Sequence, residues 1–138
     1  MAISKKLRQK VYDKYNGLCA YTGKPLDDNW QVDHVQPKSL NEWLKLGYQK
    51  EGCIALENVD CIDNLIPAIR IVNHYKRGLH LEGFRLFMLG FHKRLAKLPK
   101  KTIVHATERR IKYMNEVAYH FDIKTDKPFN GKFYFETL

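Results

Sequence analysis

The most informative segment of this chain is Val32-Asp33-His34-Val35-Gln36-Pro37. It places a carboxylate directly beside a histidine, and Asn64 and Asn73 follow in the segments 64–67 and 73–78. A carboxylate and an amide oxygen can hold a hard divalent metal ion, and an imidazole can take a proton from water. Each segment alone would be common by chance. The three in this order, inside a basic chain, are typical of a site that cuts phosphodiester bonds.

The residues before Asp33 have the pattern of a small β-hairpin. Residues 18–21 are a short apolar run, residues 22–25 form a turn signal, and residues 30–32 return as a second strand. We therefore expect a hairpin with its loop at 27–29. Adjacent residues on a regular strand point to opposite faces. Asp33 and His34 would thus flank a scissile phosphate from two sides, unless the strand twists there.

Helical patterns surround this hairpin. Apolar residues recur at helical spacing in several segments, and Asn16-Gly17, Gly78 and Pro99 supply the stop signals. Residues 36–60 form a long excursion that we expect to pack on the site or touch substrate. The tail at 127–135 suggests a turn or hairpin with an aromatic strand. The helices are expected at 3–15, 40–47, 70–80, 80–98 and from an N-cap at Thr107 to 121.

The charge balance points to a polyanionic partner. The 138 residues carry 24 Lys and Arg against 15 Asp and Glu, a net charge of +9. Each cation placed on a phosphate releases condensed counterions, so such a balance favours nucleic acid. A basic protein without such a partner is the plain alternative. An anionic membrane surface is the weaker one, because no basic amphipathic helix stands apart from the folded sequence.

The remaining composition suggests one cytoplasmic domain. The N-terminus lacks the apolar core of a secretory signal, and no apolar run reaches membrane-spanning length. Three cysteines, Cys19, Cys53 and Cys61, fit reduced thiols better than a disulfide framework. We expect residues 1–138 to form a single domain that binds no membrane.

The layout resembles the HNH endonuclease family over roughly residues 8–80. The features that carry the resemblance are Asp33-His34 at a strand end, Asn64-Leu65-Ile66-Pro67, and Asn73 followed by Lys76 and Gly78. The resemblance implies an α+β fold, with a ββα-metal (His-Me finger) core at about 16–80, an N-terminal helix, and a basic helical C-terminal extension at about 81–138. The Asp-His…Asn…Asn order is similar to the HNH domains of RNA-guided CRISPR nucleases.

The resemblance also implies roles for single residues. Asp33 would be a metal ligand, His34 the general base, and Asn64 the residue that holds the histidine and the local backbone. Asn73 would be the second metal ligand, with His74 as the alternative. The implied cofactor is Mg²⁺, or Mn²⁺ or another divalent ion, because one carboxylate and one amide leave room for water and phosphate. The implied reaction is hydrolysis of DNA by water attack, leaving 5′-phosphate and 3′-hydroxyl ends.

The cysteines depart from the family pattern. Many HNH proteins brace this fold with zinc held by two Cys-x-x-Cys pairs. Here Cys19 is followed three residues later by Thr22, and Ile69 and Val72 stand at the second pair's positions. Structural zinc is therefore not expected at that place, and apolar packing would replace it. Cys53 and Cys61 are expected to be small buried hydrophobes rather than a separate zinc site.

The C-terminal third concentrates the positive charge. Residues 84–112 hold nine Lys and Arg against one Glu. This stretch predicts a surface that tracks phosphates, with a solvated helical face as the alternative. The aromatic residues there fall on the apolar stripe and should be core. The residues expected to bind nucleic acid are Lys76, Arg77, Lys93, Arg94, Lys97, Lys100 and Lys101.

Two other functions remain open from the sequence. One is a nucleic-acid-binding module, cleavage-silent or directed at RNA, that has kept an HNH-like fold. The other is a restriction or phage-defence enzyme that needs a specific sequence or modified bases. One active site cuts one strand, so double-strand cleavage would need a homodimer, two successive nicks or a partner protein.

Overall fold

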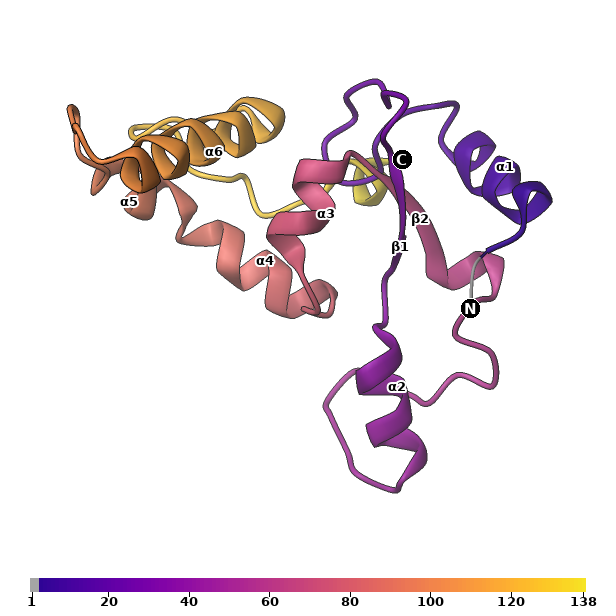
Figure 1. Ribbon diagram of the computed structural model, residues 1–138. Helices are drawn as coiled ribbons and strands as arrows, with labels where there is room; N and C mark the ends of the chain where they lie inside the picture. Colours follow the sequence, from indigo (N-terminus) through magenta and orange to yellow (C-terminus); the bar gives the residue numbers. More distant parts are fainter. Residues whose placement is uncertain (1–2) are drawn as a thin grey trace.

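The computed structural model describes residues 3–138 and has an α+β architecture. Within these residues, six α-helices surround a two-stranded antiparallel sheet (Figure 1). The sheet lies between α1 on one side and the C-terminal helices on the other. The coarse α+β prediction is therefore confirmed.

The sheet pairs strands that are far apart in the sequence. Strand β1 (Gln31–His34) pairs with β2 (Leu65–Ala68), and Asp33 lies opposite Ile66. The predicted hairpin between residues 18–21 and 30–32 is wrong. Residues 18–21 contribute only one isolated bridge, from Leu18 to Pro25, because the chain turns back at once through Gly23, whose φ is +72°.

Two properties of β2 hide its pairing from sequence patterns. Every residue of β2 is buried, so the strand has no alternating pattern to reveal it. It also contains Pro67, which cannot donate a ladder hydrogen bond and argues against a strand. The Pro67 carbonyl instead accepts from the backbone nitrogen of Ala20 at 2.9 Å, which fastens the 18–21 segment to the sheet.

Helices α1 and α3 pack beside the sheet. Helix α1 (Lys5–Lys14) begins after Ser4, whose hydroxyl accepts from the backbone nitrogen of Leu7 at 3.1 Å. This confirms the predicted N-terminal helix with slightly shorter bounds. Helix α3 (Arg70–Lys76) follows β2 directly and ends at Arg77, whose φ of +54° no longer fits a helix. It is shorter than the predicted 70–80.

The excursion between the two strands forms an arm. It contains α2 (Lys38–Lys45) and a 3₁₀ turn, η1 (Ile62–Asn64), and Figure 1 shows α2 extending away from the other helices. The predicted helix at 40–47 exists but begins two residues earlier. The buried Asn41 closes the arm internally, because its side chain donates to the Leu56 carbonyl and accepts from the Leu56 nitrogen.

The C-terminal helices differ from their predicted bounds in two places. The predicted helix at 80–98 is two helices, α4 (Leu81–Leu89) and α5 (Phe91–Ala96), separated by Gly90. Because the apolar stripe continues across Gly90, the helical periodicity of the sequence gives no sign of the break. Helix α6 (His105–Phe121) starts two residues before Thr107, with Val104 rather than Thr107 as its N-cap.

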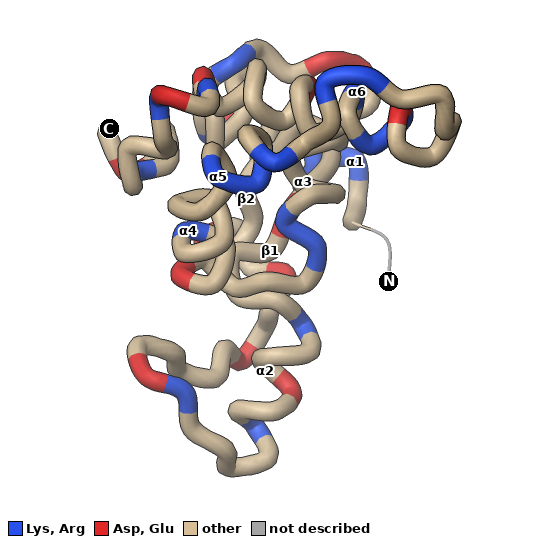
Figure 2. The backbone as a smooth tube through the Cα atoms, turned by 90° about the vertical axis from the view of Figure 1, so that its left-hand side faces the viewer, with Lys and Arg blue, Asp and Glu red and all other residues tan. Residues whose placement is uncertain are grey.

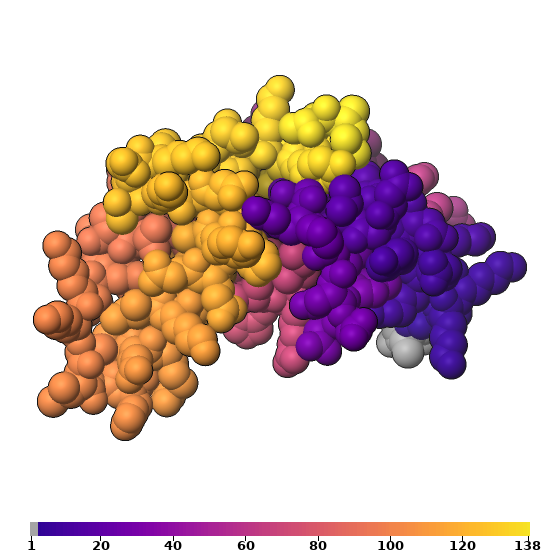
Figure 3. Space-filling view, turned by 90° about the horizontal axis from the view of Figure 1, so that it is seen from above, coloured from indigo at the N-terminus to yellow at the C-terminus, as the bar shows by residue number. Residues whose placement is uncertain are grey.

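The C-terminal tail returns to the start of the chain. Its backbone nitrogens at Tyr134 and Phe135 donate to the carbonyls of Tyr21 and Ala20 at 3.1 and 2.9 Å. Figure 3 shows this yellow segment lying against the purple N-terminal part. The predicted aromatic strand is wrong, because the tail carries a bridge from Lys124 to Lys127 and a 3₁₀ helix, η2 (Tyr134–Thr137).

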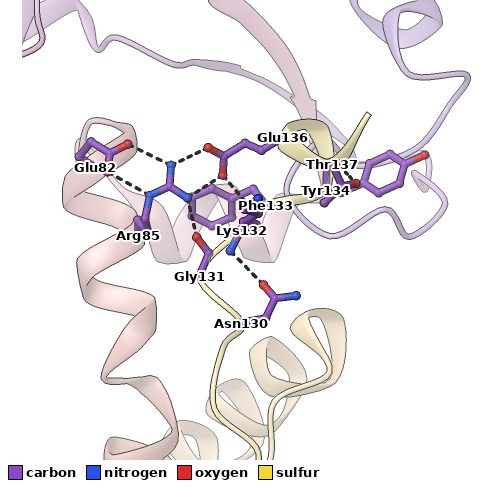
Figure 4. A network of polar contacts seen from close by, with 9 residues as sticks. All are labelled: Glu82, Arg85, Asn130, Gly131, Lys132, Phe133, Tyr134, Glu136 and Thr137. Carbon is purple, nitrogen blue, oxygen red and sulfur yellow. Dashed lines mark hydrogen bonds and ion pairs between the residues drawn. The ribbon is translucent and has the colours of Figure 1, made fainter.

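An arginine joins the tail to α4 (Figure 4). Arg85 donates to Glu136 at 2.6 Å, to Glu82 at 3.0 Å and to the Gly131 carbonyl at 2.7 Å. Its guanidinium holds the pKa of both glutamates below their usual value, chiefly by hydrogen bonding. Beneath it, Phe133 is fully buried and stacks on Phe84 at 5.2 Å between ring centroids.

One hydrophobic core connects the sheet, α3, the C-terminal helices and the tail. Its fully buried members include Phe84, Met88 and Phe91 from the predicted apolar stripe. Cys19, Ile69 and Val72 belong to the same core, and the Cys19 sulfur accepts from the Ile69 nitrogen at 3.5 Å. These residues stand at three of the four positions of a zinc knuckle, and they pack as apolar side chains. Cys53 and Cys61, expected to be buried, are only half-buried.

Candidate active site

The alternation of β1 directs its side chains to two sides. Gln31 and Asp33, two residues apart, both reach α3: Gln31 accepts from Asn73, and Asp33 contacts Lys76. His34 points away from this pair and meets Asp60 on the arm. The strand is regular, so period-two alternation alone produces this separation.

Asp33 lies in a buried ion pair. Its carboxylate accepts a hydrogen bond from the Tyr21 hydroxyl, and the Lys76 ammonium lies 3.3 Å from Oδ1 and 3.1 Å from Oδ2. Lys76 is only 1% exposed and Asp33 only 7%. Burial, and then the Asp33 charge, raise the pKa of Tyr21 well above its usual value, so the phenol stays protonated and donates.

Lys76 connects this pair to the next residue of β1. Its ammonium also donates to the His34 carbonyl at 3.2 Å. The side chain thus holds the backbone at the end of β1 and neutralises Asp33 at the same time. It was expected among the residues that contact nucleic acid, but the structure places it in the interior rather than on the surface.

His34 forms a close pair with a carboxylate of the arm. Its Nε2 lies 2.7 Å from Oδ1 of Asp60, and both side chains are half-buried. A carboxylate can only accept, so Asp60 selects the tautomer with the proton on Nε2 and leaves Nδ1 as a base. This hydrogen bond is the main cause that lowers the pKa of Asp60, with the nearby Lys38 adding to it.

Asn64 fastens the two segments that carry His34 and Asp60. Its Oδ1 accepts from the Gln36 nitrogen at 2.9 Å, and its Nδ2 donates to the carbonyls of Gln36 and Val59 at 3.1 and 2.9 Å. Gln36 follows His34 by two residues, and Val59 directly precedes Asp60. Asn64 is itself buried. Asn64 thereby links the backbone just after β1 to the backbone just before Asp60.

Asn73 and His74 point in different directions from α3. The Asn73 Nδ2 donates to Oε1 of Gln31 on β1 at 2.9 Å, which puts its amide on the side of the sheet where Asp33 lies. The exposed His74 instead pairs with α6, where its Nδ1 lies 2.7 Å from the Tyr113 hydroxyl. Of the two alternatives for a second metal ligand, Asn73 therefore faces the strand that bears Asp33.

The oxygen donors around Asp33 suit a hard metal ion, but the Lys76 ammonium already lies beside the Asp33 carboxylate. Within residues 3–138, no group of three or more His, Cys, Asp or Glu side chains could hold a metal ion. Asp33 on β1 and Asn73 on α3 each carry an oxygen donor of the kind that Mg²⁺ accepts, and Mg²⁺ keeps several waters beside one or two protein ligands. A divalent ion would have to share the Asp33 carboxylate with the Lys76 ammonium or displace it.

Many of the basic residues of the C-terminal extension lie on α5, on α6 and on the turn that joins these helices. Figure 2 shows blue segments over α5 and α6 and the turn that joins them. Arg94 is an exception to the expectation of an open phosphate contact. Its guanidinium lies 4.1 Å from the centre of the Phe87 ring and donates to the Phe87 carbonyl and the Tyr75 hydroxyl. The exposed residues of the predicted set are Arg77, Lys93, Lys97, Lys100 and Lys101.

Three residues of this site were not singled out from the sequence. Tyr21 and Gln31 lacked a signal, since a tyrosine and a glutamine near strands are common. Asp60 had a weak one, because it is an acidic residue shortly before Asn64. Its meeting with His34, 26 positions away, depends on how the arm folds back.

Comparison with models of protein families, with curated proteins and with solved structures finds no match. Within residues 3–138, no helix combines the length and the apolar composition of a membrane-spanning segment.

Proposed function

We propose that this chain is a metal-dependent endonuclease of the HNH type, which hydrolyses phosphodiester bonds in DNA. The observation that carries the proposal is the His34–Asp60 pair, 2.7 Å apart, on the strand that also presents Asp33 to α3. The proposed function is also supported by the order of elements, because helix α3 directly follows the strand pair and its Asn73 faces the strands.

In the proposed reaction, His34 takes a proton from a water molecule through Nδ1. The water oxygen then bonds to phosphorus, and the bond from phosphorus to the 3′ oxygen breaks. The leaving 3′ oxygen takes a proton from solvent water and departs as a hydroxyl, and His34 returns its proton to solvent. Asp60 holds the imidazole in the required tautomer and stabilises the imidazolium that forms. Asn64 keeps the two segments in register by its hydrogen bonds to Gln36 and Val59.

Asp33 and Asn73 are the residues that would hold Mg²⁺ or Mn²⁺. The ion, when bound, would supply positive charge for the phosphate and the leaving oxygen. Asp33 would contribute its carboxylate and Asn73 its amide oxygen, since the Asn73 nitrogen already donates to Gln31. The exposed cations of α5 and the following turn would contact the DNA backbone.

A nicking assay tests this function. Supercoiled plasmid is incubated with the full chain and Mg²⁺ or Mn²⁺, and nicked and linear forms are separated on a gel. Wild-type protein should nick the plasmid, and His34→Ala should lower the rate by about 10²–10⁴-fold. The matched control is His105→Ala, because His105 is an exposed histidine at the start of α6. Equal nicking by wild type and His34→Ala would refute the proposal.

The second candidate is a nucleic-acid-binding module that does not cleave. The observation in its favour is the Asp33 carboxylate, which Lys76 and Tyr21 already occupy. Mobility-shift assays with plasmid, modified phage DNA and RNA, run beside the nicking assay, separate the two. Binding without nicking of any of these substrates would favour the module.

A further inference from the structure

A cavity of about 690 Å³ lies where the end of α3 meets α4, α5 and α6. Volumes of this size accommodate small organic ligands. Its lining includes Tyr75, Arg77, Phe87, Arg94, Arg110 and Tyr113. Lys76 borders it as well and contacts Asp33, so the cavity adjoins the candidate active site.

The cavity has positive charge without a matching carboxylate. Arg77, Arg94 and Arg110 line it, and within residues 3–138 none of them is within ion-pairing distance of an acidic side chain. The lining residues include neither aspartate nor glutamate. The Nε of Arg94 is buried and has no hydrogen-bond partner. The Arg94 guanidinium already donates to Phe87 and Tyr75, whereas Arg77 and Arg110 are exposed and can bind phosphate through paired N–H groups.

The cavity also has aromatic walls whose positions are fixed. Tyr75 and Phe87 stack at 5.0 Å between ring centroids, and Arg94 lies over Phe87. The Tyr113 hydroxyl is tied to His74, which holds that ring between α3 and α6. Burial raises the pKa of Tyr113, whereas the nearby Arg77 charge lowers it. Rigid aromatic side chains beside cations provide the surfaces on which a nucleobase stacks.

We propose that this cavity binds a nucleotide, with the base against the aromatic walls and the phosphate on Arg77 and Arg110. The nucleotide could be free or the end of a nucleic-acid strand, since both present the same base and phosphate. The inference goes beyond cleavage and does not require it, because none of His34, Asp60 or Asn73 lines the cavity.

Calorimetric titration of the full chain with AMP tests the proposal, with adenosine and inorganic phosphate as partial ligands. AMP should bind at least about tenfold more tightly than either part, because base and phosphate contacts act together. Arg77→Ala and Arg110→Ala should each weaken AMP binding about tenfold. Arg109→Ala is the matched control, since Arg109 is the exposed neighbour on α6 and does not line the cavity. It should leave the affinity unchanged.

Further measurements identify the source of the ligand and define the results that would overturn the proposal. If a 5′-phosphorylated oligonucleotide binds more tightly than its 5′-hydroxyl form, and if this difference depends on Arg110, the ligand is the end of a strand. If the two oligonucleotides bind equally, the ligand is a free nucleotide. Absence of AMP binding, or equal losses in the Arg109 and Arg110 variants with unchanged melting temperatures, would overturn the proposal. The nicking assay on the same preparations reports separately on cleavage.

Discussion

The Lys76 ammonium lies 3.1 Å from Oδ2 of Asp33, and both side chains are almost completely buried. Charges in such a place are stable only as a pair, because each alone would lose its hydration without compensation. This pair joins α3 to β1, and the Tyr21 hydroxyl adds the 18–21 segment to it. The pair is therefore a structural link. Its ammonium group also lies against the carboxylate that is the candidate metal ligand.

Removing one partner of this pair should destabilise the fold. Lys76→Met keeps the volume of the side chain but leaves Asp33 unpaired, which should cost about 3–5 kcal/mol in the free energy of unfolding. The double variant Lys76→Met/Asp33→Asn should recover much of the loss. Urea denaturation monitored by circular dichroism measures both. The exposed Lys97→Met is the control and should stay within about 0.5 kcal/mol of wild type. A Lys76→Met loss no larger than the control would contradict the buried pair.

Divalent metal should stabilise Lys76→Met more than wild type. Without the ammonium, the Asp33 carboxylate is free to take Mg²⁺ or Mn²⁺ together with Asn73, and a ligand that binds only the folded state raises its stability. At a concentration about 100-fold above the dissociation constant, the gain is about 2.7 kcal/mol. Thermal melts with Mn²⁺ and with a chelator measure this difference.

The metal effect should depend on both oxygen donors. Adding Asp33→Asn to Lys76→Met should abolish it, and adding Asn73→Ala should reduce it. His74→Ala is the matched control on the same helix, because His74 faces Tyr113 rather than β1. A stabilisation by Mn²⁺ that survives Asp33→Asn would place the metal elsewhere.

Local signals in the sequence were enough to locate the candidate residues but not to pair them. The turn and cap residues predicted helices near α1, α2 and α3, and the Asp33-His34 pair does lie at the end of a strand. The partner of that strand comes from residues 65–68, beyond a long arm, and contains a proline. Pairing over such a distance is set by burial of a whole core, which no local pattern reports.

The same reason explains the errors at the site. Lys76 looks like a surface cation, because lysine is rarely buried without a partner. Only the fold brings Asp33, 43 positions away, to its ammonium. Asp60 likewise becomes relevant only when the arm returns to His34, and Asn64 secures that return through Gln36 and Val59.

Acid should weaken the attachment of the C-terminal tail. Arg85 lowers the pKa of Glu136 below its usual 4.5 in the folded protein, so the folded state binds fewer protons there than the unfolded chain. The resulting stability is complete above pH 4.5 and is lost as the pH falls through the lower folded pKa. Melting temperature measured against pH should therefore fall more steeply in wild type than in Glu136→Gln.

Substituting the arginine provides a second measure of this attachment. Arg85→Met should cost about 2 kcal/mol near neutral pH, because it removes charge-assisted hydrogen bonds to Glu136 and Glu82. It should also flatten the acid limb, which is the fall in melting temperature as the pH decreases, as Glu136→Gln does. Arg109→Met, on the exposed surface of α6, is the control and should leave the limb steep. An unchanged acid limb in Arg85→Met would mean that other carboxylates dominate.

Asp60→Asn should impair the proposed cleavage without affecting DNA binding. The asparagine can donate as well as accept, so it no longer fixes the proton on Nε2 of His34 or stabilises the imidazolium. The rate at saturating plasmid should fall by about 10²-fold, while the DNA affinity from mobility shifts stays unchanged. Asp63→Asn is the matched control, since Asp63 is exposed in η1 on the same segment and should retain full activity. Asp60→Glu should recover part of the rate because it restores a carboxylate. Equal rates for Asp60→Asn and Asp63→Asn would remove Asp60 from the reaction and leave it only a structural contact of the arm.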